Sequence, residues 1–178
     1  MSLSSNPPAN ESTSGITVDR ALKPLERLIG NWTTEATHPA LPGVVVKGTA
    51  SIEWLEGERF IIQRTRTEHP EFPDAISIIG STERDRVDDK GRADAHSATS
   101  HGTPSLTLHY FDSRGVFRVY DVASEPAAIR FWRLSPGFSQ RFSGTFTDNG
   151  DTIDGLWQLS NDDSHWEDDL KITFHRRR

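Results

Sequence analysis

The sequence predicts an all-β fold, an antiparallel up-and-down barrel of about ten strands with a short helical plug near its N-terminus. After residue 30 apolar and polar residues alternate with period two, in runs of about eight to ten residues. Turn-forming sequences such as DSRG and DNGD separate these runs. No helix of crossover length separates any two runs, which argues against a parallel sheet. Closure into a barrel removes exposed sheet edges.

The first elements precede the strands. Residues 1–17 are polar and rich in serine, proline and asparagine, which predicts a disordered leader before a single domain over residues 18–178. Apolar residues then follow at helical spacing, and Pro24 can open a short helix that Gly30 ends. These apolar residues are Leu22, Leu25, Leu28 and Ile29.

Ten period-two segments follow, and one long polar loop interrupts them at residues 87–105. This loop carries His96 and His101, and loops of its length are either functional or merely tolerated. An antiparallel barrel of this size can enclose a ligand cavity. The predicted strands are residues 32–38, 44–55, 60–69, 75–85, 106–112, 116–123, 128–134, 140–147, 152–160 and 166–176.

The amino-acid composition argues against several classes of protein. The 178 residues carry a formal net charge of -6, so the overall field opposes binding to nucleic acid or anionic membranes. There are no cysteines, which excludes disulfides and thiolate metal sites. No apolar run approaches the roughly 20 residues of a membrane span. We expect a cytoplasmic protein without membrane insertion, and the sequence leaves a homodimer open.

Three long segments carry a resemblance to a known group of proteins. They are LERLIGNWTTEATHPALPG, HYFDSRGVFRVYDV and FSQRFSGTFTDNGDTIDGLWQLSNDDSHWEDDLKITFHR, within a region of about residues 25–176. The chain resembles the calycins, and more closely the nitrobindin-like branch and an uncharacterised family of small lipocalin-like proteins. The resemblance implies that Trp32 closes the barrel floor and that Arg176 from the last strand lies over its indole, a stacking contact worth about 0.5–2 kcal/mol.

Haem is the cofactor that the nitrobindin resemblance raises. Nitrobindins ligate haem through a histidine on the last strand, and Asp169 stands at that position here. A carboxylate is a poor substitute for imidazole on haem iron. Period two places His175 on the same face as Asp169, and His165 precedes that strand, so either histidine could be a displaced haem ligand, with His175 as the named candidate.

Candidate ligand-binding residues follow from strand faces that mix apolar and polar side chains. Arg64 shares one face of its strand with Phe60 and Ile62, and Arg118 shares a face with Tyr120. If these faces point inward, the guanidinium groups and the phenol can hold an anionic ligand, as in fatty-acid-binding proteins. The alternative is that the arginines point outward and pair with Glu53, Glu68 or Asp121 across strands.

Aromatic residues and histidines complete the candidate set. Trp132 and Trp157 are candidates for the cavity wall, and Gly155 suits the close approach of another side chain. His109 could bind a ligand or, with a carboxylate, take part in acid–base catalysis. Two His-Pro pairs, at His38 and His69, could place imidazoles at one rim of the barrel, where they could ligate a metal with His109 or a carboxylate. Capping and packing of turns explain these histidines equally simply.

The sequence thus predicts an intracellular binding protein for a small, mostly apolar ligand that can carry a carboxylate. Its predicted ligand-binding residues are Arg64, Arg118, Tyr120, Trp132 and His109. A haem protein of nitrobindin type and a calycin-fold enzyme of unknown reaction remain alternatives. No catalytic motif is identified, and no resident metal other than haem iron is predicted.

Overall fold

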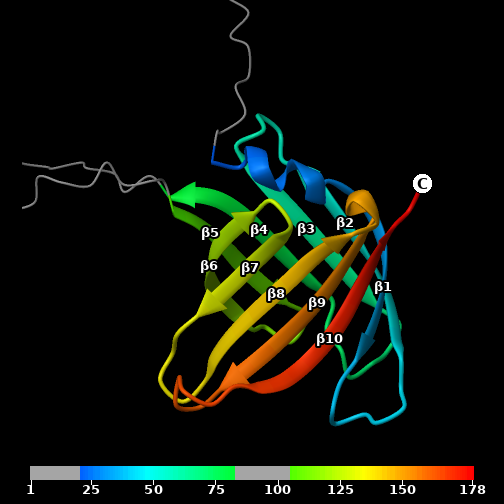
Figure 1. The fold of residues 1–178 in the computed structure, drawn as a ribbon, viewed down its shortest axis with the longest axis vertical. Helices are drawn as coiled ribbons and strands as arrows, with labels where there is room; N and C mark the ends of the chain where they lie inside the picture. The colour runs from blue at the N-terminus through cyan, green and yellow to red at the C-terminus, as the bar shows by residue number, and fades with distance from the viewer. Residues whose placement is uncertain (1–20, 83–104) are drawn as a thin grey trace, which may run out of the picture.

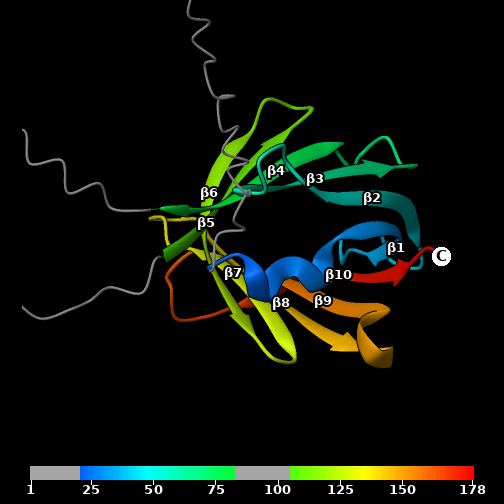
Figure 2. The ribbon, with the colours of Figure 1, turned by 90° about the horizontal axis from the view of Figure 1, so that it is seen from above.

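The computed structural model describes residues 21–82 and 105–178. They form one closed antiparallel barrel in which every strand pairs with its neighbour in sequence and the last strand, β10, pairs with β1 (Figure 1). Figure 2 shows the strands arranged as a ring, and in Figure 1 the short helix η1, Lys23–Leu28, lies at the upper end of the barrel. The strands are β1 Gly30–Thr37, β2 Val46–Trp54, β3 Phe60–Thr67, β4 Ala75–Thr82, β5 Ser105–Asp112, β6 Phe117–Glu125, β7 Ala128–Arg133, β8 Ser139–Thr147, β9 Thr152–Ser160 and β10 Glu167–Arg176.

The predicted fold class is confirmed: each of the ten period-two segments forms one strand, and the plug is a 3-10 helix. The predicted leader at residues 1–17 lies outside the described residues. So do residues 87–104 of the long polar loop, with His96 and His101. Within the described ranges, no helix has the length and apolar character that a membrane span requires.

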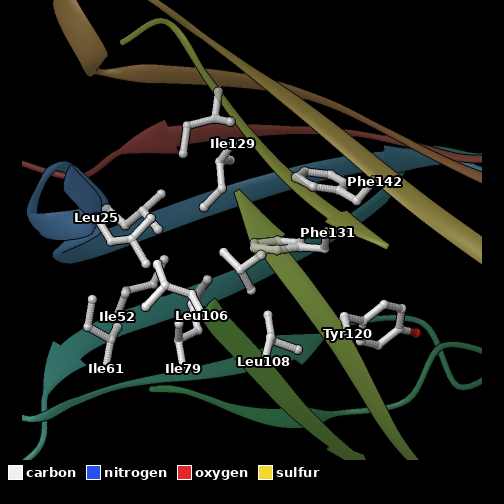
Figure 3. Close-up of a cluster of buried hydrophobic side chains, with 14 of the residues drawn as sticks. Leu25, Ile52, Ile61, Ile79, Leu106, Leu108, Tyr120, Ile129, Phe131 and Phe142 are labelled. Carbon is white, nitrogen blue, oxygen red and sulfur yellow. The ribbon is translucent and has the colours of Figure 1, made fainter. Parts of the chain in front are cut away.

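Period-two alternation separates the inside of the barrel from the outside. On β1, Trp32, Thr34 and Ala36 are buried, whereas the residues between them are exposed. The inward side chains at the η1 end are mainly aliphatic, and Figure 3 shows Ile61, Ile79 and Leu106 gathered near Leu25. Burial of this apolar surface closes one end of the barrel.

The helix η1 forms the floor of the barrel. Pro24 occupies its first turn, where a missing N–H costs nothing, and the side chains of Leu22, Leu25 and Leu28 are almost fully buried. The indole N–H of Trp32 donates to the carbonyl oxygen of Leu28 at 3.0 Å, which fixes the end of the helix to the first strand.

Arg176 completes this floor. Its guanidinium carbon lies 4.1 Å from the centroid of the Trp32 ring. Its N–H groups donate to the carbonyls of Ile29 at 2.7 Å and Arg27 at 2.6 Å. Gly30 has a φ of +144°, and a Cβ there would lie 2.6 Å from Arg176 Nη1, so a side chain would displace the guanidinium. The spacing of Gly30 and Trp32 therefore serves closure of the floor.

Candidate functional site

A cavity of about 490 Å³ occupies the barrel between the floor and the opposite, loop-bearing end. Its volume lies within the range of small-molecule sites in proteins. Its wall is apolar toward the floor and polar toward the loops. The apolar lining comprises Leu28, Ile52, Leu108, Ile129, Phe131, Phe142, Ile153, Trp157, Ile172 and Phe174.

Aromatic rings from β6 to β9 form one continuous side of this wall. Phe131 and Phe142 are stacked, with ring centroids 5.3 Å apart and an interplanar angle of 15° (Figure 3). Trp157 lies 5.1 Å from Phe142 and 5.4 Å from Tyr120, measured between ring centroids. This side of the cavity offers aromatic surface to an apolar ligand.

Two glycines make room for the aromatic wall. Gly144 on β8 and Gly155 on β9 face each other in the sheet. A Cβ at Gly155 would lie 2.6 Å from the ring of Phe142, and one at Gly144 would lie 2.9 Å from it. The absence of both side chains lets the Phe142 ring lie against the sheet instead of filling the cavity.

The polar part of the aromatic side is centred on Tyr120. Its hydroxyl donates to Gln140 Oε1 at 2.9 Å, and both residues line the cavity. Burial raises the pKa of Tyr120, while hydrogen bonding by Arg118 and the positive charges of Arg118 and Arg133 oppose this effect and Asp169 adds to it. The phenol is therefore neutral at physiological pH and acts as a hydrogen-bond donor.

Arg118 lies on β6 two residues before Tyr120 and also lines the cavity. Its guanidinium carbon is 5.0 Å from the centroid of the Phe138 ring. Among the described residues it forms no ion pair with a carboxylate. This leaves a positive charge in the cavity wall that can attract an anionic group.

His38 and Asp169 lie where the cavity meets the loops. His38 Nε2 is 3.1 Å from Asp169 Oδ1, and His38 Nδ1 accepts the backbone N–H of Ala40 at 3.0 Å. Because Nδ1 accepts, the ring proton of a neutral His38 lies on Nε2 and is donated to Asp169. The contact joins the end of β1 to the start of β10.

A β-bulge aims Asp169 into the cavity. The register of β10 against β9 shifts between Asp168 and Leu170, so that Asp169 is an extra residue. As a result both Asp169 and Leu170 line the cavity, although they are adjacent in sequence.

The turn between β5 and β6 is organised by Asp112. Its Oδ1 accepts the backbone N–H groups of Arg114 at 2.9 Å and Val116 at 3.0 Å, and its Oδ2 accepts the Tyr110 hydroxyl at 3.2 Å. Burial of this carboxylate by itself raises its pKa, but these hydrogen bonds outweigh burial and hold the pKa below its usual value. Burial and the nearby Asp112 raise the pKa of Tyr110.

The structure places some of the predicted ligand-binding residues in the cavity wall and others on the outside of the barrel. Arg118 and Tyr120 line the cavity. Arg64 does not: it points outward and forms an ion pair with Glu53, the alternative that the sequence had left open. Gln63 and Thr65 take the inward positions on β3 instead.

Trp132 and His109 are also absent from the described cavity wall, which corrects their assignment. On β7 the inward neighbour Phe131 lines the cavity, so Trp132 faces outward. On β5, Leu108 and Tyr110 face inward, and His109 packs against Phe117 on the outer side with ring centroids 6.1 Å apart. The geometry therefore does not support acid–base catalysis by His109 inside the cavity.

His175 does not fit the role of a haem ligand. It is exposed and pairs with Thr33 on the outer side of the barrel, while its neighbour Phe174 is buried inside. The expectation that it shares a face with Asp169 was wrong because the bulge shifts the alternation of β10. The histidine that lines the described cavity is His38, and both of its ring nitrogens are engaged. The described lining of the cavity therefore offers no free imidazole to haem iron.

The two His-Pro pairs do lie at one rim. The rings of His38 and His69 each contact Phe72 edge to face, with centroids 6.1 Å and 5.7 Å away. His69 Nδ1 accepts the backbone N–H of Glu71, which is a turn-capping contact. Residues 21–82 and 105–178 contain no group of three or more histidine and acidic side chains that could hold a metal ion.

Sequence reasoning missed Gln140 and Phe131 as cavity residues. Gln140 lies two residues before Phe142 and four before Gly144 on β8, so the period-two pattern places all three on the same face of the strand. Phe131 was not predicted to line the cavity because its larger neighbour Trp132 was predicted to do so. In both cases the signal was the alternation itself, once one inward residue of the strand is known.

Comparisons with known proteins support the fold and do not assign a family. No family model matches the sequence, and no curated protein matches it. Among solved structures, the chain is similar to Rv2717c from M. tuberculosis with a TM-score of 0.59 and 14% sequence identity, over 91% of this chain and 100% of that chain. The chain therefore has a closed β-barrel fold like that of Rv2717c, and at this identity the likeness extends to the fold alone.

Proposed function

We propose that this protein binds a small, mostly apolar molecule inside its barrel and holds a polar or anionic group of that molecule near Arg118. The observation that carries the proposal is the cavity of about 490 Å³, which combines an aromatic side with a guanidinium that lacks a carboxylate partner among the described residues. Such a cavity with a few convergent polar groups is typical of small-molecule sites.

Apolar burial provides the main driving force in this proposal. Moving a CH₂ group of the ligand from water onto the wall of Phe131, Phe142 and Trp157 contributes about 0.8 kcal/mol. The polar group of the ligand then sets its orientation. A positive charge in a largely apolar wall is stabilised when an anion reaches it, and Arg118 offers that charge on the polar side of the cavity.

Filling the cavity tests the proposal with dodecanol as an uncharged probe. Thr65 lines the cavity on β3, opposite the aromatic side in strand order. Thr65→Phe places a ring in the ligand space and should weaken dodecanol binding by more than about tenfold, equal to about 1.4 kcal/mol. Displacement of the fluorescent dye 1,8-anilinonaphthalene sulfonate measures the affinity.

Thr49→Phe is the matched control, because Thr49 is exposed on the outer side of β2. It introduces the same ring at the surface and should leave dodecanol binding unchanged. Equal affinities of the wild type and Thr65→Phe, or a failure of the wild type to bind either dye or dodecanol, would refute binding inside the barrel.

A further inference from the structure

We infer that the polar group recognised in this cavity is a carboxylate, and that Gln140 is the second residue, beside Arg118, that recognises it. The inference rests on the proposed function and names the chemical class of the ligand. Gln140 lies on β8 and lines the cavity, although only 6% of its surface is exposed.

Among the described residues, the protein forms a hydrogen bond with the oxygen of the Gln140 side-chain amide but not with its nitrogen. Its Oε1 accepts the Tyr120 hydroxyl at 2.9 Å, and this contact orients the amide from β6 across the intervening strand β7. Its Nε2 donates to no partner within the described part of the chain. The protein thus fixes one end of the amide and leaves the two N–H donors of the other end free.

The free Nε2 reaches the cavity. In residues 21–82 and 105–178, Ser124 Oγ is the one fully enclosed side-chain nitrogen or oxygen without a hydrogen-bond partner. Gln140 Nε2 also lacks a partner and is therefore not fully enclosed, and the cavity is the space that Gln140 lines. A buried donor of this kind is stabilised when a ligand oxygen accepts its N–H.

The groups near Gln140 favour a ligand group that accepts hydrogen bonds. Arg118 carries only donors, and the hydrogen of the Tyr120 hydroxyl is already donated to Gln140. Asp169, the nearby negative charge, is held by His38 and forms no ion pair with Arg118. A carboxylate offers one oxygen to Arg118 and the other to Gln140, whereas an alcohol has a single oxygen and an ammonium group has no acceptor.

The test compares laurate with dodecanol, which share an alkyl chain and differ in the head group. Calorimetric titration at pH 8 should show that the wild type prefers laurate by at least about tenfold, the discrimination expected from charge-assisted hydrogen bonds. Gln140→Glu keeps the acceptor for Tyr120 and replaces the N–H donors by a carboxylate oxygen. It should abolish the preference for laurate, measured as the ratio of the laurate and dodecanol affinities of the same variant.

Gln63→Glu is the matched control. Gln63 lines the same cavity from β3, so this variant adds the same negative charge away from Arg118 and Tyr120. It should keep most of the preference for laurate. An equal loss in both variants would show general repulsion by charge and overturn the specific role of Gln140.

A measurement on the unaltered protein covers the case in which Gln140→Glu does not fold. The side-chain NH₂ resonances of ¹⁵N-labelled Gln140 should shift more on addition of laurate than on addition of dodecanol, and equal shifts would overturn the inference. Resonances that respond to neither ligand would overturn the inference. If dodecanol binds inside the barrel but laurate is not preferred, the carboxylate assignment fails while the cavity function stands; if neither binds, both fail.

Discussion

The guanidinium of Arg118 lies in the cavity wall, whereas that of Arg64 lies on the outside of the barrel. Arg64 has a carboxylate partner in Glu53 on the neighbouring strand, and Arg118 has none among the described residues. The same side chain is thus a surface ion-pair partner at one site and a candidate anchor for an anion at the other. Surface ion pairs contribute little, about 0–1 kcal/mol.

This contrast gives a prediction for a pair of matched variants. Arg118→Met keeps much of the aliphatic stem and removes the charge, and it should weaken laurate binding by about tenfold or more, since hydrogen bonds to charged groups contribute about 1.5–3 kcal/mol. Arg64→Met makes the same change outside the barrel and should leave the calorimetric affinity within error. A similar loss in both variants would argue against anion recognition by Arg118.

These two arginines also show why the sequence alone did not identify which residues line the cavity. Period two separates the two faces of each strand but does not say which face points inward when both carry polar residues. On β3 the inward face holds Gln63 and Thr65, and the outward face begins with Phe60 and Ile62. The apolar residues at the start of the outward face made the wrong face resemble the core.

At the scale of elements, turns and a bulge set the shape of the cavity mouth. The DSRG turn forms where Asp112 was expected to begin it, because the carboxylate accepts the N–H groups of the turn. The bulge at Asp169 could not be predicted, because Glu167, Asp168 and Asp169 are all acidic and show no alternation in which an extra residue could be recognised. It determines that Asp169 and not His175 reaches the inside of the barrel.

The Asp112 turn predicts a pH-dependent contribution to stability. Since the folded pKa of Asp112 lies below its unfolded value of about 3.9, its stabilisation is full above that pH and is lost as the pH falls through the folded pKa. Asp112→Asn should lower the free energy of unfolding by about 1–3 kcal/mol at pH 7. The difference from the wild type should shrink below about pH 4.

Urea unfolding between pH 2.5 and 7 measures this effect. Asp121→Asn is the control, because Asp121 is exposed on β6 and no side-chain hydrogen bond or ion pair of it is found within the described residues. It should follow the wild type at every pH. A constant difference between Asp112→Asn and the wild type across the range would contradict the assigned role of the carboxylate.

At the scale of the whole molecule, the barrel has a sealed end and a polar end. The sealed end consists of η1, Trp32 and Arg176, and the carbonyls of Arg27 and Ile29 accept hydrogen bonds from the guanidinium. The strand order and the plug could be predicted because they follow from alternation, turn residues and a short helical pattern. The volume of the cavity could not, because it depends on how rings such as Phe142 pack against glycines of the sheet.

A small apolar molecule that binds within the barrel should lie against the aromatic side of the cavity. The most direct measurement is a set of intermolecular nuclear Overhauser effects between bound dodecanol and assigned aromatic protons of the protein. Contacts are expected from the alkyl chain to Phe131, Phe142 and Trp157, which line the cavity, and none to the outward-facing Trp132. Contacts to Trp132 and to the exposed Phe117, without contacts to the cavity rings, would contradict binding within the barrel.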